Sequence, residues 1–290
     1  MKYKKFRELV FDPYCIKFKK IKIKKILNYM PAGNDVIECT CNIDGLNKIV
    51  FVKIERSRMA DFASEVFNLK KLQKYDLYTK IPKLLEYGFI NEKRYIVLSK
   101  INGKRLSEIL ISNDKDKRKK YLMRYGSELA KIHNIDSSYF LPAKQRIIND
   151  APNGKDYNNI DNYISKLLKF LNAKKPNFNK KTFIHGDFHY ANILWKSGKI
   201  SGVLDYEYSG KGFKEQDIAW SLVLRPGQRF LDCYEDIKFF LDGYKKYNNY
   251  DSCKLKWCLI NAYCHFYLMN IDNLEYINKI KKLISIIIKL

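Results

Sequence analysis

Three side chains with oxygen atoms stand at intervals that suit the transfer of a phosphoryl group. Asp187 is followed five residues later by Asn192 and, thirteen residues after that, by Asp205. Phosphoryl transfer needs a carboxylate that accepts the proton of the attacking hydroxyl, and oxygen ligands that fix magnesium on the phosphates. These residues can supply all three oxygen sites, so the spacing predicts a phosphoryl-transfer site with Asp187 as the base.

The residues around Asp187 strengthen this interpretation. With His185 and Asn192 it fits the pattern H-x-D-x-x-x-x-N of kinase catalytic loops, with glycine in place of arginine. A Lys-Ser-Gly-Lys turn follows and leads into an extended segment at 200–204, which predicts a hairpin. We expect this hairpin to return Asp205 toward the other two residues.

Lys53 and Glu65 are candidates for a buried ion pair. Lys53 shares one face of a predicted strand with Ile49 and Phe51, where an unpaired ammonium group would be costly. Glu65 lies beside the apolar stripe of a predicted helix and can reach inward to pair with it. The alternative is two surface charges, one on an edge strand and one on a solvated helix.

The first hundred residues predict an antiparallel sheet with one helix. Segments with strand character are separated by turn-like sequences and lie at about 22–30, 35–42, 48–54, 84–89 and 95–98. Apolar residues recur at helical spacing over 59–75, between the third and fourth of these segments.

The remainder predicts mainly helices. Helical spacing of apolar residues is found at about 106–110, 121–133, 157–171, 232–247 and 255–269, and a terminal core helix is expected around 283–288. An extended stretch at 183–206 interrupts the helices, and the polar, turn-rich segment 136–159 is expected to be an insertion. The sequence therefore predicts an α+β architecture with lobes at 1–100 and 101–290.

Charge and cysteine content exclude several classes of protein. The net charge is +24, but the lysines are spread through every segment and no nucleic-acid recognition motif is present, so we do not expect a nucleic-acid partner. The seven cysteines include no C-x-x-C pair, which predicts buried thiols rather than a zinc site or a disulfide framework. No apolar run reaches the length of about 20 residues that spans a bilayer, so we expect a cytoplasmic protein.

Three segments resemble the signature blocks of aminoglycoside phosphotransferases and their choline, thiamine and homoserine kinase relatives. They are His-Gly-Asp-Phe-His-Tyr-Ala-Asn-Ile-Leu at 185–194, Val-Leu-Asp-Tyr-Glu at 203–207 and Asp-Ile-Ala at 217–219. Val-Lys-Ile at 52–54 and Ala-Ser-Glu-Val at 63–66 look like the lysine strand and partner helix of the same family. The resemblance covers most of residues 30–245.

This resemblance implies a two-lobed protein-kinase-like fold, with a small antiparallel-sheet N-lobe, a larger mainly helical C-lobe and ATP bound between them. It would make Asp187 the base and Asn192 and Asp205 the ligands of Mg²⁺. Lys53 would contact the α- and β-phosphates of ATP, with Glu65 as its partner. The protein would then be an ATP-dependent phosphotransferase with an alcohol group as acceptor.

Three further positions resemble nucleotide-binding elements of kinases. Gly33 sits where kinases close a glycine-rich loop over the phosphates, although a turn with one glycine is equally consistent with a plain hairpin. Ser99 and Ile101 resemble the hinge whose backbone pairs with the edge of adenine. The alternative for these two residues is an ordinary connector between lobes.

Other residues near the signature blocks have two interpretations each. His189 could contact the substrate or have a structural role. Glu207 shares a face of an extended chain with Asp205 and could touch a second metal or an amine, or it could be solvated. Asp217 resembles the family's carboxylate that braces the catalytic loop through backbone amides.

The acceptor is expected to be a small molecule. Only eleven residues separate Asp205 from Asp217, which leaves little room for an activation loop and a peptide platform. An aminoglycoside-like amino sugar and a choline- or ethanolamine-like amino alcohol remain open, with homoserine or thiamine behind them, and aromatic residues such as Trp220 could contact a quaternary amine. A pseudokinase that binds nucleotide without turnover is the alternative from another class.

Overall fold

The structure is a computed structural model of the 290-residue chain. It describes residues 12–31, 33–56, 60–75, 77, 79–112, 114–144, 150–153 and 161–289. The chain forms two compact units: unit 1 comprises Met1–Asn102 and Gly202–Glu207, and unit 2 comprises Gly103–Ser201 and Tyr208–Leu290. Unit 1 is therefore assembled from two separate parts of the chain.

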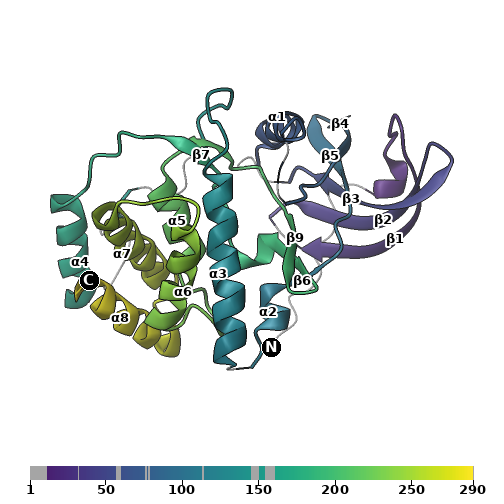
Figure 1. The fold of residues 1–290 in the computed structure, drawn as a ribbon. Coiled ribbons are helices and arrows are strands. Elements are labelled where there is room, and N and C mark those ends of the chain that lie inside the picture. The colour runs from purple at the N-terminus through teal and green to yellow at the C-terminus, as the bar shows by residue number, and fades with distance from the viewer. Residues whose placement is uncertain are drawn as a thin grey trace. The chain divides into compact units, whose positions relative to one another are not determined.

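Unit 1 is built on a five-stranded antiparallel sheet with the strand order β1-β2-β3-β5-β4 (Figure 1). The strands are β1 (Lys22–Pro31), β2 (Asp35–Ile43), β3 (Leu46–Ile54), β4 (Leu84–Ile90) and β5 (Lys93–Ser99). Buried and half-buried side chains alternate along the whole of β2, because one face of the strand packs on the core. All five predicted strands are confirmed.

Helix α1 (Phe62–Leu72) follows β3 in unit 1. Asp61 caps its N-terminus, since one carboxylate oxygen accepts the amide N–H of Ser64 at 3.0 Å. The helix is shorter than the predicted 59–75, whose first residue lies outside the described residues.

The segment Gly202–Glu207 is held within unit 1 by hydrogen bonds to residues far away in the sequence. The amide of Val203 donates to the carbonyl of Lys80 at 3.0 Å. The side chain of Asn68, on α1, donates to the carbonyl of Tyr206 at 3.2 Å. The residues that precede and follow Asp205 are thus both anchored to this unit.

Unit 2 is mainly helical. Its helices are α2 (Leu106–Ile109), α3 (Lys115–Ile132), α4 (Asn162–Ala173), α5 (Lys214–Leu222), α6 (Tyr234–Lys245), α7 (Ser252–Met269) and α8 (Leu274–Lys289). Helix α7 packs against α4, α5 and α8, and most of its side chains are buried (Figure 1). This agrees with its predicted apolar character on nearly every side.

Helices α3 and α6 pack closely because each presents a glycine to the other. A Cβ atom on Gly126 would overlap the carbonyl of Phe240, and one on Gly243 would overlap the carbonyl of Met123. The hydroxyl of Ser127 also donates to the carbonyl of Gly243 at 2.8 Å. Glycine is required at both positions by this close approach.

Short strands adjoin the first two segments that resemble the signature blocks, whereas the third, at 217–219, lies on α5. The short strands are β6 (Lys104–Arg105), β7 (Thr182–Ile184), β8 (Ile193–Lys196), β9 (Lys199–Val203) and β10 (Gly210–Gly212). Strands β8 and β9 form the predicted hairpin, whose turn residues Ser197 and Gly198 have φ values of 50° and 71°. Positive φ at both positions is typical of tight hairpin turns.

Some sequence-based expectations differ from the structure. Helix α5 was not expected from hydrophobic spacing, because it is short and its first turn carries Glu215 and Asp217. Helix α4 spans Asn162–Ala173, and Asp161 accepts the amide of Ile164 as its N-cap. The first residues of the predicted helix lie outside the described part of the chain.

The expectation that the cysteines are buried is correct for only part of the set. Cys39, Cys41, Cys258 and Cys264 are buried. Cys15 and Cys253 are exposed, since the first ends a short 3-10 helix and the second lies in the first turn of α7.

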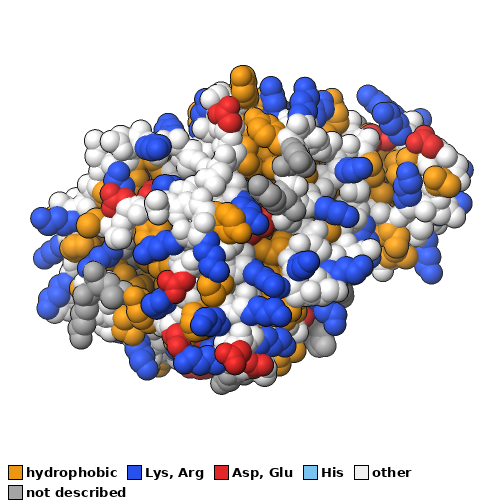
Figure 2. Space-filling view, viewed as in Figure 1, with side chains coloured by type: hydrophobic (Ala, Val, Ile, Leu, Met, Phe, Trp, Pro, Cys, Tyr) orange, Lys and Arg blue, Asp and Glu red, His pale blue; other side chains and the backbone are white. Residues whose placement is uncertain are grey.

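Lysine and arginine side chains are spread over the face that Figure 2 shows rather than gathered in one patch. Among the residues that the structure describes, no helix is both long enough and apolar enough to cross a membrane.

Candidate active site

Lys53 on β3 and Glu65 on α1 form a buried ion pair in unit 1. The Nζ atom of Lys53 lies 2.6 Å from Oε2 of Glu65, and the two side chains are only 9% and 1% exposed. Ile49, on the same strand face, is 40% exposed, so the strand face alone does not bury the lysine. Its ammonium group is enclosed by Glu65 and by the ring of Phe62, whose centroid lies 5.2 Å away.

Asp205 joins this pair from the end of β9. One of its carboxylate oxygens lies 3.1 Å from Nζ of Lys53, and its side chain keeps 36% of its surface exposed. Burial alone would lower the pKa of Lys53, but the carboxylates of Asp205 and Glu65 outweigh it and raise that pKa, so the ammonium stays charged. Asp205 has a φ of 67°, a conformation that residues other than glycine rarely adopt and that is concentrated at functional sites.

Glu207 is buried and braces this part of unit 1. Its Oε1 accepts the amide of Asp61 at 2.8 Å, and its Oε2 accepts from the side chain of Asn34 at 3.4 Å. One oxygen from each of Glu65, Asp205 and Glu207 lies within 4.8 Å of the others, an arrangement that can hold a metal ion. The solvated alternative for Glu207 is therefore wrong.

The predicted catalytic loop lies in unit 2 and is fixed by Asp217 on α5. The carboxylate of Asp217 accepts the amide of His185 at 2.8 Å and that of Gly186 at 3.0 Å. It also lies 3.1 Å from Nε2 of His133. Burial would raise the pKa of Asp217. Its partners, of which His133 has the largest effect, outweigh burial and lower that pKa, so the carboxylate of Asp217 is ionised.

Asp187 is held by donors on both of its carboxylate oxygens. The indole N–H of Trp220 donates to Oδ1 at 2.8 Å. The amide group of Asn192 donates to Oδ2 at 3.2 Å and to the Asp187 carbonyl at 3.0 Å. This bonding uses the nitrogen of Asn192 and leaves its amide oxygen as the atom suited to a metal.

His189 has a structural contact within the same loop. Its Nδ1 accepts the amide of Ala191 at 3.3 Å, which caps the 3-10 helix η4 (Tyr190–Asn192). Its Nε2 lies 3.7 Å from Oδ1 of Asp187. The structural interpretation of His189 is supported, and its other ring nitrogen faces Asp187.

The remaining nucleotide-site candidates lie in unit 1. Gly33 is exposed in the turn between β1 and β2, and a Cβ atom there would meet nothing within 4 Å. The amide of Ser99 donates to the carbonyl of Lys83 at 2.9 Å and is therefore engaged inside the sheet. Ile101 follows β5 and packs against Gly202, where an added Cβ would lie 2.7 Å from its Cγ2.

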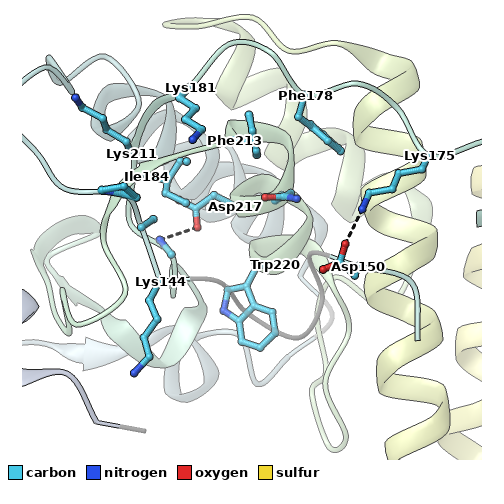
Figure 3. Close-up of a pocket in the computed structure, with 15 residues that line it drawn as sticks. Lys144, Asp150, Lys175, Phe178, Lys181, Ile184, Lys211, Phe213, Asp217 and Trp220 are labelled. Atoms are coloured by element: carbon cyan, nitrogen blue, oxygen red, sulfur yellow. Dashed lines mark hydrogen bonds and ion pairs between the residues drawn. The ribbon is translucent and has the colours of Figure 1, made fainter. Parts of the chain in front are cut away.

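The contact of Trp220 with Asp187 was not recognised from the sequence. Trp220 was expected only as one of several aromatic residues that could contact an amine. Figure 3 shows its indole among the residues that line a cavity in unit 2, on the same helix as Asp217. The signal available in the sequence was its position, three residues after Asp217 and hence on one face of the helix.

Comparison with known proteins gives matches over most of the chain. Residues 44–251 match the model of a family described as the phosphotransferase enzyme family. An aminoglycoside 3'-phosphotransferase from Enterococcus faecalis is 26% identical over 191 residues, which cover 61% of this chain and 71% of that protein.

Solved structures show a similar fold. A thermostable mutant of aminoglycoside phosphotransferase APH(4)-Ia, in a ternary complex with ADP and hygromycin B, has a TM-score of 0.64 at 13% identity, covering 92% of this chain and 94% of that one. Macrolide 2'-phosphotransferase MphH from Brachybacterium faecium has a TM-score of 0.56 at 12% identity, covering 90% and 93%. The predicted α+β, protein-kinase-like fold is confirmed.

Proposed function

Since the chain belongs to the phosphotransferase enzyme family, we propose that it transfers the γ-phosphoryl group of ATP to a hydroxyl of a small molecule, with Asp187 as the base. The protein is an ATP-dependent phosphotransferase whose acceptor is an alcohol group, and its cofactors are ATP and Mg²⁺. The observation that carries the proposed role is the hydrogen bonding of Asp187, whose two oxygens are fixed by Trp220 and Asn192.

In the proposed reaction, Asp187 accepts the proton of the acceptor hydroxyl and later releases it to water. The hydroxyl oxygen forms a bond to the γ-phosphorus, and the bond from that phosphorus to the bridging oxygen breaks. The electron pair of the broken bond leaves with ADP. Since this chemistry relies on positioning and charge, a base held by two donors suits it.

The candidate residues have the chemistry that magnesium and the phosphates require. Asn192 offers an amide oxygen and Asp205 a partly exposed carboxylate, and oxygen ligands of this kind fit Mg²⁺. Magnesium, when bound, neutralises charge on the phosphate oxygens. Lys53, kept charged and fixed by Glu65, would contact the α- and β-phosphates.

The same contacts favour an enzyme over a pseudokinase. The ion pair of Lys53 with Glu65 and the hydrogen bond from Asn192 to Asp187 support a working kinase.

The test is the release of ADP from Mg-ATP in the presence of acceptors. The panel contains aminoglycosides, macrolides, choline, ethanolamine, homoserine, thiamine, sugar acids and sugar phosphates. Replacing Asp187 with alanine should lower kcat by about 10²- to 10⁴-fold, the range for loss of a general base. Removal of magnesium with EDTA should stop turnover, and added Mg²⁺ should restore it.

Asp272→Ala is a matched control, because this carboxylate is exposed and lies outside the candidate site. It should leave kcat unchanged. The proposal is abandoned if no acceptor gives turnover that depends on Asp187.

A further inference from the structure

Unit 2 contains a cavity of about 400 Å³ beside the catalytic loop. Gly186, which precedes Asp187, lines it, and so does Trp220, whose indole N–H donates to Asp187 at 2.8 Å. A volume of this size falls within the range of pockets that bind small molecules. The cavity is therefore a place in unit 2 where an acceptor can lie close to Asp187.

The charges around this cavity are mainly positive. Four lysines line it: Lys144, Lys175, Lys181 and Lys211 (Figure 3). Within the described part of the chain, neither Lys181 nor Lys211 has a carboxylate within ion-pair distance. The ammonium group of Lys181 lies 5.7 Å from the ring centroid of Phe213, which also lines the cavity.

The two acidic residues of the lining are already engaged. Asp217 accepts the amides of His185 and Gly186 and is buried. Asp150 forms an ion pair with Lys175 at 2.6 Å, which Figure 3 shows at the edge of the cavity. Neither carboxylate offers the concentrated negative charge that a polycation requires.

Aromatic rings form the apolar part of the lining. Phe178 and Phe213 lie with their centroids 5.0 Å apart, and Trp220 is the third ring. Small-molecule sites commonly combine apolar and aromatic walls with a few charged groups that set orientation. In this cavity, Lys181 and Lys211 are charged groups of that kind.

Building on the proposed function, we propose that the acceptor is a hydroxyl compound with a carboxylate or phosphate group, and that Lys181 and Lys211 bind this anion. The anionic group takes no part in the bond changes, so the transfer is the one given above. It orients the acceptor so that a hydroxyl faces Asp187. Amino sugars and amino alcohols would instead be repelled by the lysines.

Two series of acceptors test the charge preference, each on one scaffold. The hexose series is glucose, glucosamine, glucuronate and glucose 6-phosphate, and the glycerol series is glycerol, ethanolamine, glycerate and glycerol 3-phosphate. ADP release is measured at saturating Mg-ATP. We expect kcat/KM to be at least about tenfold higher for an anion than for the amine of its series, and the carboxylate and phosphate arms identify which anion is bound.

Charge-reversal variants make the result specific to the cavity. Lys181→Glu and Lys211→Glu should each lower kcat/KM for the anionic acceptor about tenfold and raise it for the amine of the same series. A folding defect would lower both values. Lys166→Glu, an equal change of charge at an exposed residue of α4 outside the lining, should alter neither.

Several outcomes would overturn the inference. These are turnover confined to neutral or cationic acceptors, no turnover with any anion, and anion turnover that the two cavity variants leave unchanged. Turnover that depends on Asp187 and is as fast with an amine as with the anion of its series, or faster, would overturn this inference alone and leave the proposed function standing. Absence of turnover with every acceptor, including the amines, would count against the proposed function itself.

Discussion

The indole nitrogen of Trp220 lies 2.8 Å from Oδ1 of Asp187 and donates a hydrogen bond to it. Helix α5 thus orients the proposed catalytic loop twice, through this bond to Asp187 and through Asp217, which accepts the two preceding amides. A loop residue held by a rigid helix keeps its side chain in one geometry, which catalysis requires.

Replacing Trp220 with phenylalanine keeps a ring in place and removes the donor. We expect kcat to fall about tenfold, because a base that is misplaced by a fraction of an ångström loses catalytic efficiency. Steady-state kinetics with Mg-ATP and an active acceptor measure the effect. Trp257→Phe is the control, since that indole donates to the carbonyl of Leu171, away from the loop, and should affect stability but not kcat. An unchanged kcat in Trp220→Phe would contradict the positioning role.

The buried pair of Lys53 and Glu65 predicts strong coupling in stability. Glu65→Leu should lower the free energy of unfolding by about 3–5 kcal/mol, because it removes one partner of a buried pair. The double variant Lys53→Met with Glu65→Leu should recover much of that loss, since apolar pairs replace buried ion pairs well.

Urea denaturation of the two single variants and the double variant gives the coupling free energy. The exposed pair of Lys238 and Asp242, 2.7 Å apart on α6, is the control, and its removal should cause no measurable change. If the losses of unfolding free energy in the two single variants add up to the loss in the double variant, Lys53 and Glu65 are not coupled.

Two glycines should respond differently to alanine. Gly186 has a φ of 76°, and a Cβ atom there would overlap the carbonyl of Tyr208. Gly186→Ala should therefore displace the loop and lower kcat by about tenfold or more.

Gly33→Ala should leave the KM for ATP within about twofold of the wild type, because an added Cβ meets no atom within 4 Å. A large increase in KM for ATP in this variant would instead support the glycine-rich-loop role considered for Gly33.

His265 predicts a dependence of stability on pH. Burial lowers the pKa of His265 from its usual 6.5, and the carbonyl of Asp150 only partly opposes this effect. The unfolded chain therefore binds a proton at higher pH than the folded one, so the free energy of unfolding falls as pH drops below about 6.5. His265→Gln should flatten this part of the curve, as measured by urea denaturation from pH 7.5 to 5. If the stability curves of the wild type and of His265→Gln stay parallel from pH 7.5 to 5, His265 is not buried in its neutral form.

The sheet of unit 1 and the loop at Asp187 could be predicted because their signals are local. Alternating side chains specify a strand such as β2, and the interval from Asp187 to Asn192 is spanned by one turn of chain, so their hydrogen bond follows from spacing. The hairpin of β8 and β9 was likewise visible in its turn residues.

The roles of Trp220 and Glu207 depend on contacts between distant segments, which the local pattern does not contain. Trp220 reaches Asp187 from a helix that hydrophobic spacing did not indicate. Glu207 reaches the amide of Asp61, and 146 positions separate them in the sequence. Only the packing of each unit shows that these residues act as supports.

Because unit 1 contains two separate parts of the chain, it cannot be completed on the ribosome until the second part has been synthesised. Its final segment, Gly202–Glu207, is synthesised about 100 residues after Asn102, and it supplies the carboxylate of Asp205 to Lys53. At a synthesis rate of about 5–20 residues per second, roughly 5–20 s pass between the synthesis of Asn102 and that of this segment. During that interval the buried ammonium of Lys53 has Glu65 but lacks Asp205, so unit 1 reaches its final state only after most of the chain has emerged.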